Sequence, residues 1–318
     1  MKYIFASLMW FGISVSAFAG QSLIEYADMC TAEIGEIPAF DCTQGTIVPI
    51  TVNGVEPTNY TKDMLCDRPA LLPYPKNTFG QCTPYSRIHN LSKGDKQISA
   101  FCRREMLRAP DSPLYDEVDI ILHSVKTGAT CWFHAENKSG NTAGFDASRV
   151  PPPNEKIPPP GKVSAEKFWW KPARTAEKDC GACHDADPFM YSPWIGQKWA
   201  QVPQDPLGKY IHLGKDFTGK GWESAAISTR DNTCIGCHRI GNKQSCSNYI
   251  QYASGMKLPT GVNQLASSYP LNHWMPVQNN QSESFWQHVH QGSVNNLLTC
   301  CNNPLNPMCT LTPITQKK

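Results

Sequence analysis

Apolar and β-branched residues in the first half of the chain gather in short runs separated by turn residues, a pattern typical of strands. Thr46–Val52 runs directly into Asn53-Gly54, a dipeptide that favours a tight hairpin turn. Val118–Val125 is a second such run, Lys126–Gly128 supplies a turn, and Ala129–Ala135 returns as its partner. The pattern therefore predicts an early strand and a later hairpin.

Gln97–Arg108 has a different spacing, because its apolar residues recur roughly on one face of a helix and Pro110 follows it. We expect a helix there. His123 and His134 would lie in the predicted hairpin, where we expect packed or exposed rings rather than ligands. Residues 21–150 as a whole predict a β-leaning domain.

The segment 151–161 contains six prolines in eleven residues, which excludes a helix or a central strand. It predicts an extended, semi-rigid linker between two domains. A strap packed across the surface is the alternative.

Residues 162–318 read as short helices and irregular chain. Asp231 or Thr233 can begin one helix and Gly241 can end it, while Ser282–Leu298 predicts another helix, or two, capped by Ser282. Seven of the eight tryptophans beyond residue 20 lie in this part, enough aromatic area to build a large apolar pocket.

The first residues have the pattern of a secretory signal peptide. Lys2 precedes an apolar run from Tyr3 to Phe18, and Ala17–Ala19 forms a cleavage site of small residues. We expect residues 1–20 to be removed after Ala19 or Gly20, with a membrane anchor as the alternative. No later stretch is apolar enough to span a bilayer, so we expect no transmembrane segment after cleavage.

Two five-residue stretches share the pattern C-x-x-C-H: Cys180–His184 and Cys234–His238. This pattern is typical of covalent haem attachment, because two thiols on one side of a helical turn can add to the haem vinyl groups while the histidine reaches the iron. A thioredoxin-like dithiol would need a βαβ surrounding, and none is evident. A zinc site usually has a shorter spacing between the pairs, and ordinary disulfides leave the histidines unexplained.

The remaining ten of the fourteen cysteines divide evenly around the motifs. Such numbers favour disulfides in an oxidising compartment. We expect pairing inside each set, with adjacent Cys300 and Cys301 joined to different partners. The first set is Cys30, Cys42, Cys66, Cys82, Cys102 and Cys131, and the second is Cys246, Cys300, Cys301 and Cys309.

At the two motifs the chain resembles the c-type cytochromes, over ten residues of 318. The resemblance implies two covalently bound haem c groups. One is attached through Cys180 and Cys183 with His184 on the iron. The other is attached through Cys234 and Cys237 with His238 on the iron. Haem attachment and export together imply the periplasm, with the cell surface or the extracellular space as alternatives.

The motifs lie 54 residues apart, too close for two complete cytochrome domains in tandem. We therefore expect an α+β protein in which a disulfide-stapled, β-leaning N-terminal domain precedes one mostly α-helical or irregular di-haem domain over 162–318, with a stapled C-terminal tail.

The sixth iron ligand decides between carrying electrons and binding a substrate. For the iron at His238 we expect Met275, which precedes a proline, or else His273. For the iron at His184 we expect His212, or else Met190, whose short separation leaves little chain to round the porphyrin. His288 and His290 are weaker candidates on a predicted helix.

The sequence therefore predicts an exported electron-transfer protein that passes single electrons between redox partner proteins. A haem enzyme with one open iron, such as a peroxidase or a small-molecule oxidoreductase, is the first alternative. A docking or adhesion module that carries haems is the second. The formal net charge of +2 gives no reason to expect nucleic acid as a partner.

Overall fold

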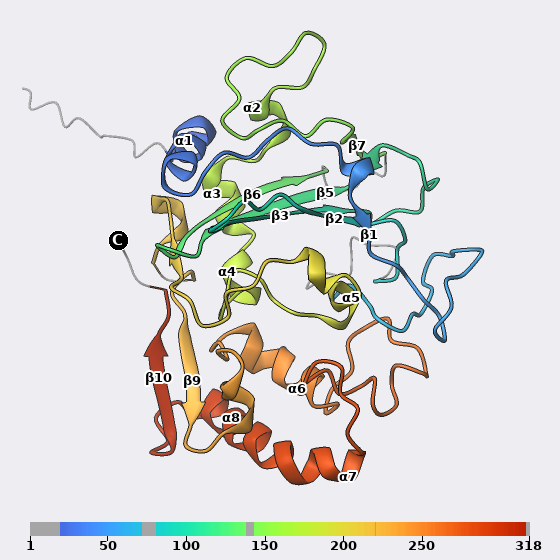
Figure 1. Ribbon diagram of the computed structural model, residues 1–318, viewed down its shortest axis with the longest axis vertical. Coiled ribbons are helices and arrows are strands. Elements are labelled where there is room, and N and C mark those ends of the chain that lie inside the picture. Colours follow the sequence, from blue (N-terminus) through green and yellow to red (C-terminus); the bar gives the residue numbers. More distant parts are fainter. Residues whose placement is uncertain (1–19, 72–80, 138–142, 220, 316–318) are drawn as a thin grey trace, which may run out of the picture.

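The computed structural model of the chain describes residues 20–71, 81–137, 143–219 and 221–315 (Figure 1). The predicted signal peptide lies outside the described residues except for Gly20. Among the described residues, no helix has both the length and the apolar character needed to cross a membrane.

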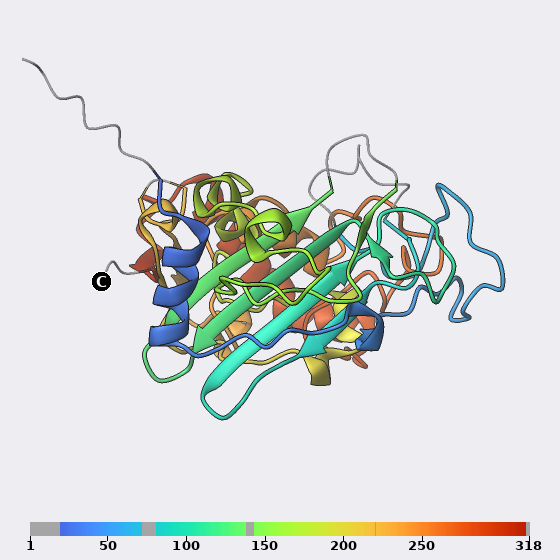
Figure 2. The ribbon, with the colours of Figure 1, turned by 90° about the horizontal axis from the view of Figure 1, so that it is seen from above.

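A six-stranded sheet occupies the middle of the molecule, with helices and irregular chain on both of its faces (Figures 1 and 2). All neighbouring strands are antiparallel except β6 and β8, which run parallel. The strand order is β1 (Thr46–Ile47), β2 (Arg87–Asn90), β3 (Lys96–Arg103), β5 (Glu117–Ser124), β6 (Ala129–Glu136) and β8 (Ile211–His212).

The predicted hairpin is confirmed, since β5 and β6 pair antiparallel with Ile121 opposite Trp132. The early strand is shorter than Thr46–Val52, because β1 ends at Ile47. Val52 then pairs with Val55 around the turn at Asn53-Gly54, where both residues have a positive φ.

The helix predicted over Gln97–Arg108 is wrong. This segment contains β3, an interior strand paired with β2 and β5 along its length. Ile98, Ala100 and Cys102 alternate onto one buried face, so the two-residue period decides the structure here. Pairing on both sides outweighs a weak helical spacing.

The upper face of the sheet packs against α1 (Leu23–Glu33), which lies at one end of the strands (Figure 2). Ser22 and Glu25 form a capping box at its start. Tyr26 is fully buried and its hydroxyl accepts a hydrogen bond from the Trp132 amide at 2.9 Å. Helix α1 thereby fixes the strand that carries Trp132.

The lower face of the sheet is covered mainly by the chain from Cys180 onward (Figure 1). Short helices there include α4 (Cys180–Cys183), α5 (Pro193–Gly196) and α6 (Ile250–Ala253), the last continuing a π-helical turn over Ser245–Tyr249. The other elements are α2 (Ala165–Phe168), α3 (Pro172–Glu177), α7 (Glu283–Trp286), α8 (Gly292–Asn302), β4 (Leu114–Tyr115) paired with β7 (Phe145–Asp146), and β9 (Ala225–Thr229) paired with β10 (Cys309–Pro313).

The helix predicted over Ser282–Leu298 is present. Ser282 caps α7 through its side chain, a π-helical turn at Gln287–Gln291 follows, and α8 continues the helix through Gly292. Gly292 is therefore the first residue of α8 and does not break the helix.

Five disulfides follow the predicted division into two sets. Cys300 and Cys301 have different partners, as expected. The pairs are Cys30–Cys131, Cys42–Cys102 and Cys66–Cys82 in the first set, and Cys246–Cys301 and Cys300–Cys309 in the second.

The proline-rich segment 151–161 packs against the protein at its start. Pro151 and Pro153 are buried, and the Pro151 carbonyl accepts a hydrogen bond from the Trp169 indole at 2.8 Å. The hydrophobic core continues through this region, because β8 extends the sheet and both Trp169 and Trp222 belong to the main hydrophobic core. The domain limits 21–150 and 162–318 stay a prediction.

Candidate functional site

The first motif lies beneath the sheet, where α4 places Cys180 and Cys183 in one helical turn. The ring of His184 is enclosed, with its centroid 5.1 Å from that of Trp132 on β6. The Tyr210 hydroxyl donates to the His184 carbonyl at 2.9 Å. Burial lowers the pKa of His184 to about 4, so its imidazole is neutral. Nδ1 of this ring is buried without a hydrogen-bond partner.

The second motif begins in a 3-10 turn over Thr233–Gly236. Its cap is Asn232, whose side chain accepts from the Cys234 amide, rather than the Asp231 or Thr233 that we expected. His238 Nδ1 lies 2.8 Å from the Arg239 carbonyl oxygen. A carbonyl only accepts, so Nδ1 carries the proton and Nε2 keeps its lone pair.

The four motif cysteines are free thiols, whereas the other ten cysteines form disulfides. Burial raises the thiol pKa of Cys180, Cys183 and Cys234. Raised values argue against a reactive thioredoxin-type dithiol, which needs a depressed one. The cluster of potential metal ligands found among the described residues lies elsewhere.

Each motif opens into its own cavity, which we call the inner and the outer cavity. The inner cavity has a volume of about 340 Å³ and lies between α4 and the lower face of the sheet. Its wall includes Cys180, Cys183 and His184 on one side, with Phe101 and Trp132 from the sheet. The β-leaning segment thus forms part of the first motif's surroundings.

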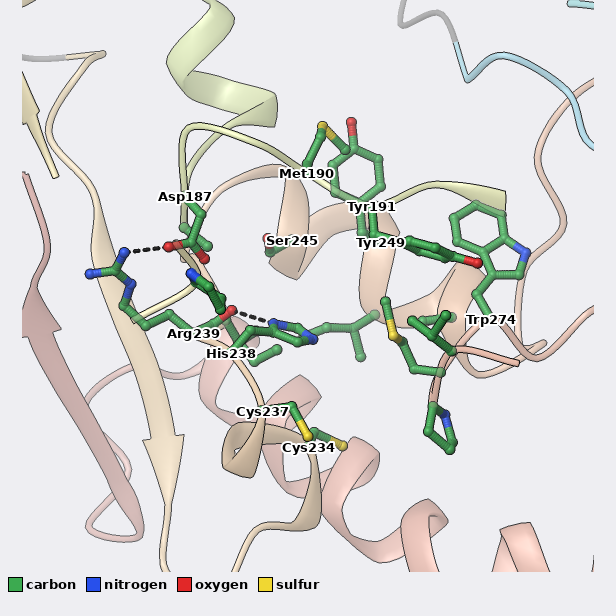
Figure 3. A pocket seen from close by; sticks show the side chains of 18 of the residues that line it. Asp187, Met190, Tyr191, Cys234, Cys237, His238, Arg239, Ser245, Tyr249 and Trp274 are labelled. Carbon is green, nitrogen blue, oxygen red and sulfur yellow. Dashed lines mark hydrogen bonds and ion pairs between the residues drawn. The ribbon is translucent and has the colours of Figure 1, made fainter. Parts of the chain in front are cut away.

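The outer cavity, of about 550 Å³, is lined by residues from 183–206 and 233–297. Figure 3 shows Cys234 and Cys237 on one side of it, Met190 and Tyr191 on the other, and His238 pointing between them. An ion pair between Arg239 and Asp187 closes one end. Cys237 is exposed, so this cavity reaches the surface beside the motif.

The two cavities adjoin. Four residues line both of them: Cys183, Phe189, Met190 and Tyr249. A single layer of side chains therefore separates the surroundings of the two motifs.

The residues present fit a haem at each motif. Both cavities fall within the usual size range of small-molecule and cofactor sites, and aromatic and aliphatic side chains supply most of the walls. Two free thiols and an imidazole lie at the wall of each. The bond from His238 Nδ1 to a carbonyl is the arrangement that fixes the tautomer of an iron-ligating histidine.

The four candidates for a sixth ligand are placed differently. Met275 lines the outer cavity, and Met190 lines both. His212 lines neither, because it lies behind Trp132, whose indole donates to His212 Nδ1 at 3.1 Å. His273 also lines neither, since its ring packs between Tyr269 and Trp286.

His290 lines the outer cavity, and His288 does not. His290 Nδ1 lies 2.9 Å from the Thr233 hydroxyl, while Nε2 is buried without a partner. Its place next to the second motif comes from the packing of the helix Ser282–Leu298 against Thr233, which spacing in the sequence does not reveal.

Sequence reasoning missed a cluster of charged residues on the sheet wall of the inner cavity. Three of its members lie on β5 and β6: Glu117, Asp119 and His134, whose possible ligand atoms all fall within 4.8 Å of one another. Burial alone would lower the pKa of His134, but Asp119 and the neighbouring glutamates raise it to about 9. We had expected an ordinary packed or exposed ring there.

The same cluster shifts the neighbouring carboxylates in opposite directions. Burial opposes ionisation of Glu117, yet Arg103 and His134 lower its pKa to about 2. Burial and Glu117 raise the pKa of Asp119 to about 6. Charged residues at alternate positions of an otherwise apolar strand were the available signal in the sequence.

Comparisons with family models, with curated proteins and with solved structures find no match to this chain. The functional conclusion therefore depends on the motifs and on the geometry around them.

Proposed function

We propose that this protein is an exported di-haem c-type cytochrome that transfers single electrons between redox partner proteins. Cys180 and Cys183 would hold one haem, and Cys234 and Cys237 the other. The observation that carries the proposal is the pair of adjoining cavities, each with two free thiols and a histidine at its wall. Neither a disulfide nor a zinc site requires such cavities.

Bound haem supplies a one-electron change at iron, and the chain's own residues set its surroundings. The Arg239 carbonyl holds the His238 ring in one tautomer. Trp132 and Tyr210 restrict the ring and the backbone of His184. The apolar walls exclude water, which is one of the means by which a protein tunes a redox potential.

The position of the two cavities supports a direction of access. Cys237 is exposed whereas Cys180 is half-buried, so we assign the approach of a partner protein to the outer cavity. Met190 and Tyr249 lie between the cavities and are common to both walls. In this proposal the outer site exchanges electrons with partners and the inner site exchanges them with the outer one.

Export is supported by two independent features. Five disulfides join the described residues, which favours an oxidising compartment. The first 20 residues have the pattern of a signal peptide. The periplasm is the compartment that we propose, with the cell surface and the extracellular space as alternatives.

A haem enzyme that acts on a small molecule is the second candidate, and one observation favours it. Among the described residues that line the inner cavity, His184 is the histidine and Met190 is the one thioether. Met190 also lines the outer cavity, so it would be shared between the two sites and could leave the inner iron without a second protein ligand. An iron without such a ligand can bind a substrate.

Intact-mass analysis of the exported, acid-denatured protein tests the proposal. We expect the processed chain plus two haem masses. C180A/C183A and C234A/C237A should each retain one haem. C66A/C82A removes a disulfide outside the motifs and should retain both, which makes it the matched control. A parent protein without added haem mass would refute the proposal.

A further inference from the structure

We propose that Glu117, Asp119 and His134 form a binding site for a divalent first-row metal ion, separate from the two haem motifs. The site lies on the sheet wall of the inner cavity, and the proposal does not depend on haem. Zn²⁺ is the ion that we would use to probe it.

The three side chains converge because of strand register. Asp119 on β5 lies directly opposite His134 on β6, and Glu117 projects from the same face two residues away. His134 Nδ1 lies 2.7 Å from Asp119 Oδ1 and 3.8 Å from Glu117 Oε1. Strand β5 is paired on both sides, and the His134 carbonyl on β6 accepts a hydrogen bond from the Trp170 amide at 2.9 Å, so the backbone beneath the site is held in place.

The distances from His134 Nδ1 to the two carboxylates lie on either side of the spacing expected between two ligands of one metal ion. Two ligands about 2.0–2.2 Å from a common ion are roughly 3–3.5 Å apart. The Asp119 contact must open by a few tenths of an ångström and the Glu117 contact must close by a similar amount. Rotations of side chains at the edge of a cavity can supply both adjustments.

The second nitrogen of His134 is also accounted for. Nε2 lies 3.3 Å from Glu136 Oε2, and Lys178 pairs with the same carboxylate at 2.6 Å. A metal-ligating histidine usually donates its other N–H to a carboxylate, which fixes the ring and makes it a better ligand. Glu136 occupies that position here.

The balance of charge at this end of the cavity is compatible with a cation. Four carboxylates line it: Glu105, Glu117, Asp119 and Glu136. The cationic side chains that line it with them are Arg103 and Lys178. With His134 protonated, these three cations balance three of the carboxylates, and burial raises the pKa of the fourth, Glu105, to about 7. A divalent ion that replaces the His134 proton adds one positive charge, which deprotonated Glu105 can balance.

Arg103 leaves room for the ion. Its guanidinium binds Glu117 Oε2 at 3.0 Å, whereas Oε1 is the oxygen that faces His134. The inner cavity provides a path of entry and space for water or another ligand at the remaining coordination positions. One imidazole and two carboxylates suit Zn²⁺ or Mn²⁺ better than Ca²⁺, which prefers oxygen ligands alone.

Titration calorimetry with ZnCl₂ tests the site on the full C180A/C183A chain, whose inner cavity holds no attached haem, after chelator treatment and dialysis. This chain is the parent in which the further substitutions are made. We expect one ion per chain, more than 100-fold weaker binding in H134Q and D119N, and 10–100-fold weaker binding in E136Q. H89Q is the matched control, because His89 belongs to the opposite face of the same sheet and should leave binding unchanged.

A second readout protects the test against variants that fold poorly. Zn²⁺ in excess should raise the melting temperature of the parent and of H89Q but not that of D119N. If the parent binds no Zn²⁺, or if H134Q and D119N bind it as tightly as the parent, the proposal is wrong. Absorption of the haem in the same samples reports separately on the proposed function.

Discussion

The inner and the outer motif share a five-residue pattern but lie in contrasting surroundings. At the inner motif, His184 is enclosed beneath the sheet and its Nδ1 has no partner. At the outer motif, His238 is held by a carbonyl bond and Cys237 reaches the surface. Under the proposed function, the motif would specify haem attachment, while the surrounding fold specifies access and polarity. Two sites with one sequence pattern can therefore have different roles in one protein.

The origin of the walls differs as well. Outer-cavity residues come mostly from 183–206 and 233–297, close to the motifs in sequence. The inner cavity depends on strands β3, β5 and β6, which precede its motif by more than forty residues. Changes in the N-terminal sheet should therefore affect the inner site first. Four experiments test whether the inner and outer sites respond differently.

Removal of a disulfide should have the largest effect on stability, and the effect should differ between the two regions. Cys30–Cys131 closes a separation of 101 residues and anchors β6 next to Trp132, whereas Cys300–Cys309 closes only 9. Loop entropy predicts losses of about 4.7 and 2.6 kcal/mol respectively. Denaturant unfolding of C30A/C131A and C300A/C309A would measure them. An equal loss would contradict the comparison.

Trp132→Ala should cost about 3–5 kcal/mol of unfolding free energy, because the ring is buried and its removal leaves a cavity. Trp274→Ala at the half-buried outer wall should cost clearly less. Trp132→Ala should also change the spectrum of the inner haem alone. If both haem spectra changed equally, the two surroundings would not be independent.

Met275→Ala should open the outer iron to carbon monoxide and lower the potential of that haem by on the order of 100 mV, since methionine ligation raises it. Met256→Ala is the control, because this methionine is exposed and lies outside both cavities. Carbon monoxide difference spectra and redox titration supply the readouts. Rapid binding at the outer iron of the unaltered protein would contradict the proposed ligand.

The smallest effect concerns pH at the outer site. Burial raises the pKa of Asp187 to about 7, despite its ion pair with Arg239. Deprotonation adds a negative charge as pH rises through that value, and a negative charge favours the oxidised iron. The outer potential should therefore fall between pH 6 and 8, by less than the ~59 mV per pH unit of full coupling.

Asp187→Asn should flatten this slope, whereas Asp231→Asn at an exposed position should leave it unchanged. Redox titration at several pH values measures both variants. A slope that persists in Asp187→Asn would assign the effect to another group.

Local patterns predicted local structure well. The hairpin of β5 and β6 and the helix that begins at Ser282 follow from adjacent residues, and the disulfide sets follow from position relative to the motifs. The helix predicted over Gln97–Arg108 failed because its apolar spacing fits both periods, and strands distant in sequence decided between them.

The candidate site was predictable only in part, for the same reason. Which ligand candidate reaches a cavity depends on packing between distant segments. Met275 lines one cavity. His212 is held behind Trp132 by strand β8, which begins 82 residues after β6 begins. The cluster around His134 likewise needs the register of two strands, which spacing along one chain does not contain.

The separation of the disulfides into two sets has a consequence for assembly. A chain exported from its N-terminus presents the first six cysteines before any motif thiol emerges. Those six can close three disulfides among themselves while Cys180 and Cys183 are still inside the cell. Under the proposed function, the four motif thiols would meet haem after the first set of disulfides has closed. The order of cysteines along the chain would thereby reduce competition between that first set and haem attachment for the same sulfur atoms.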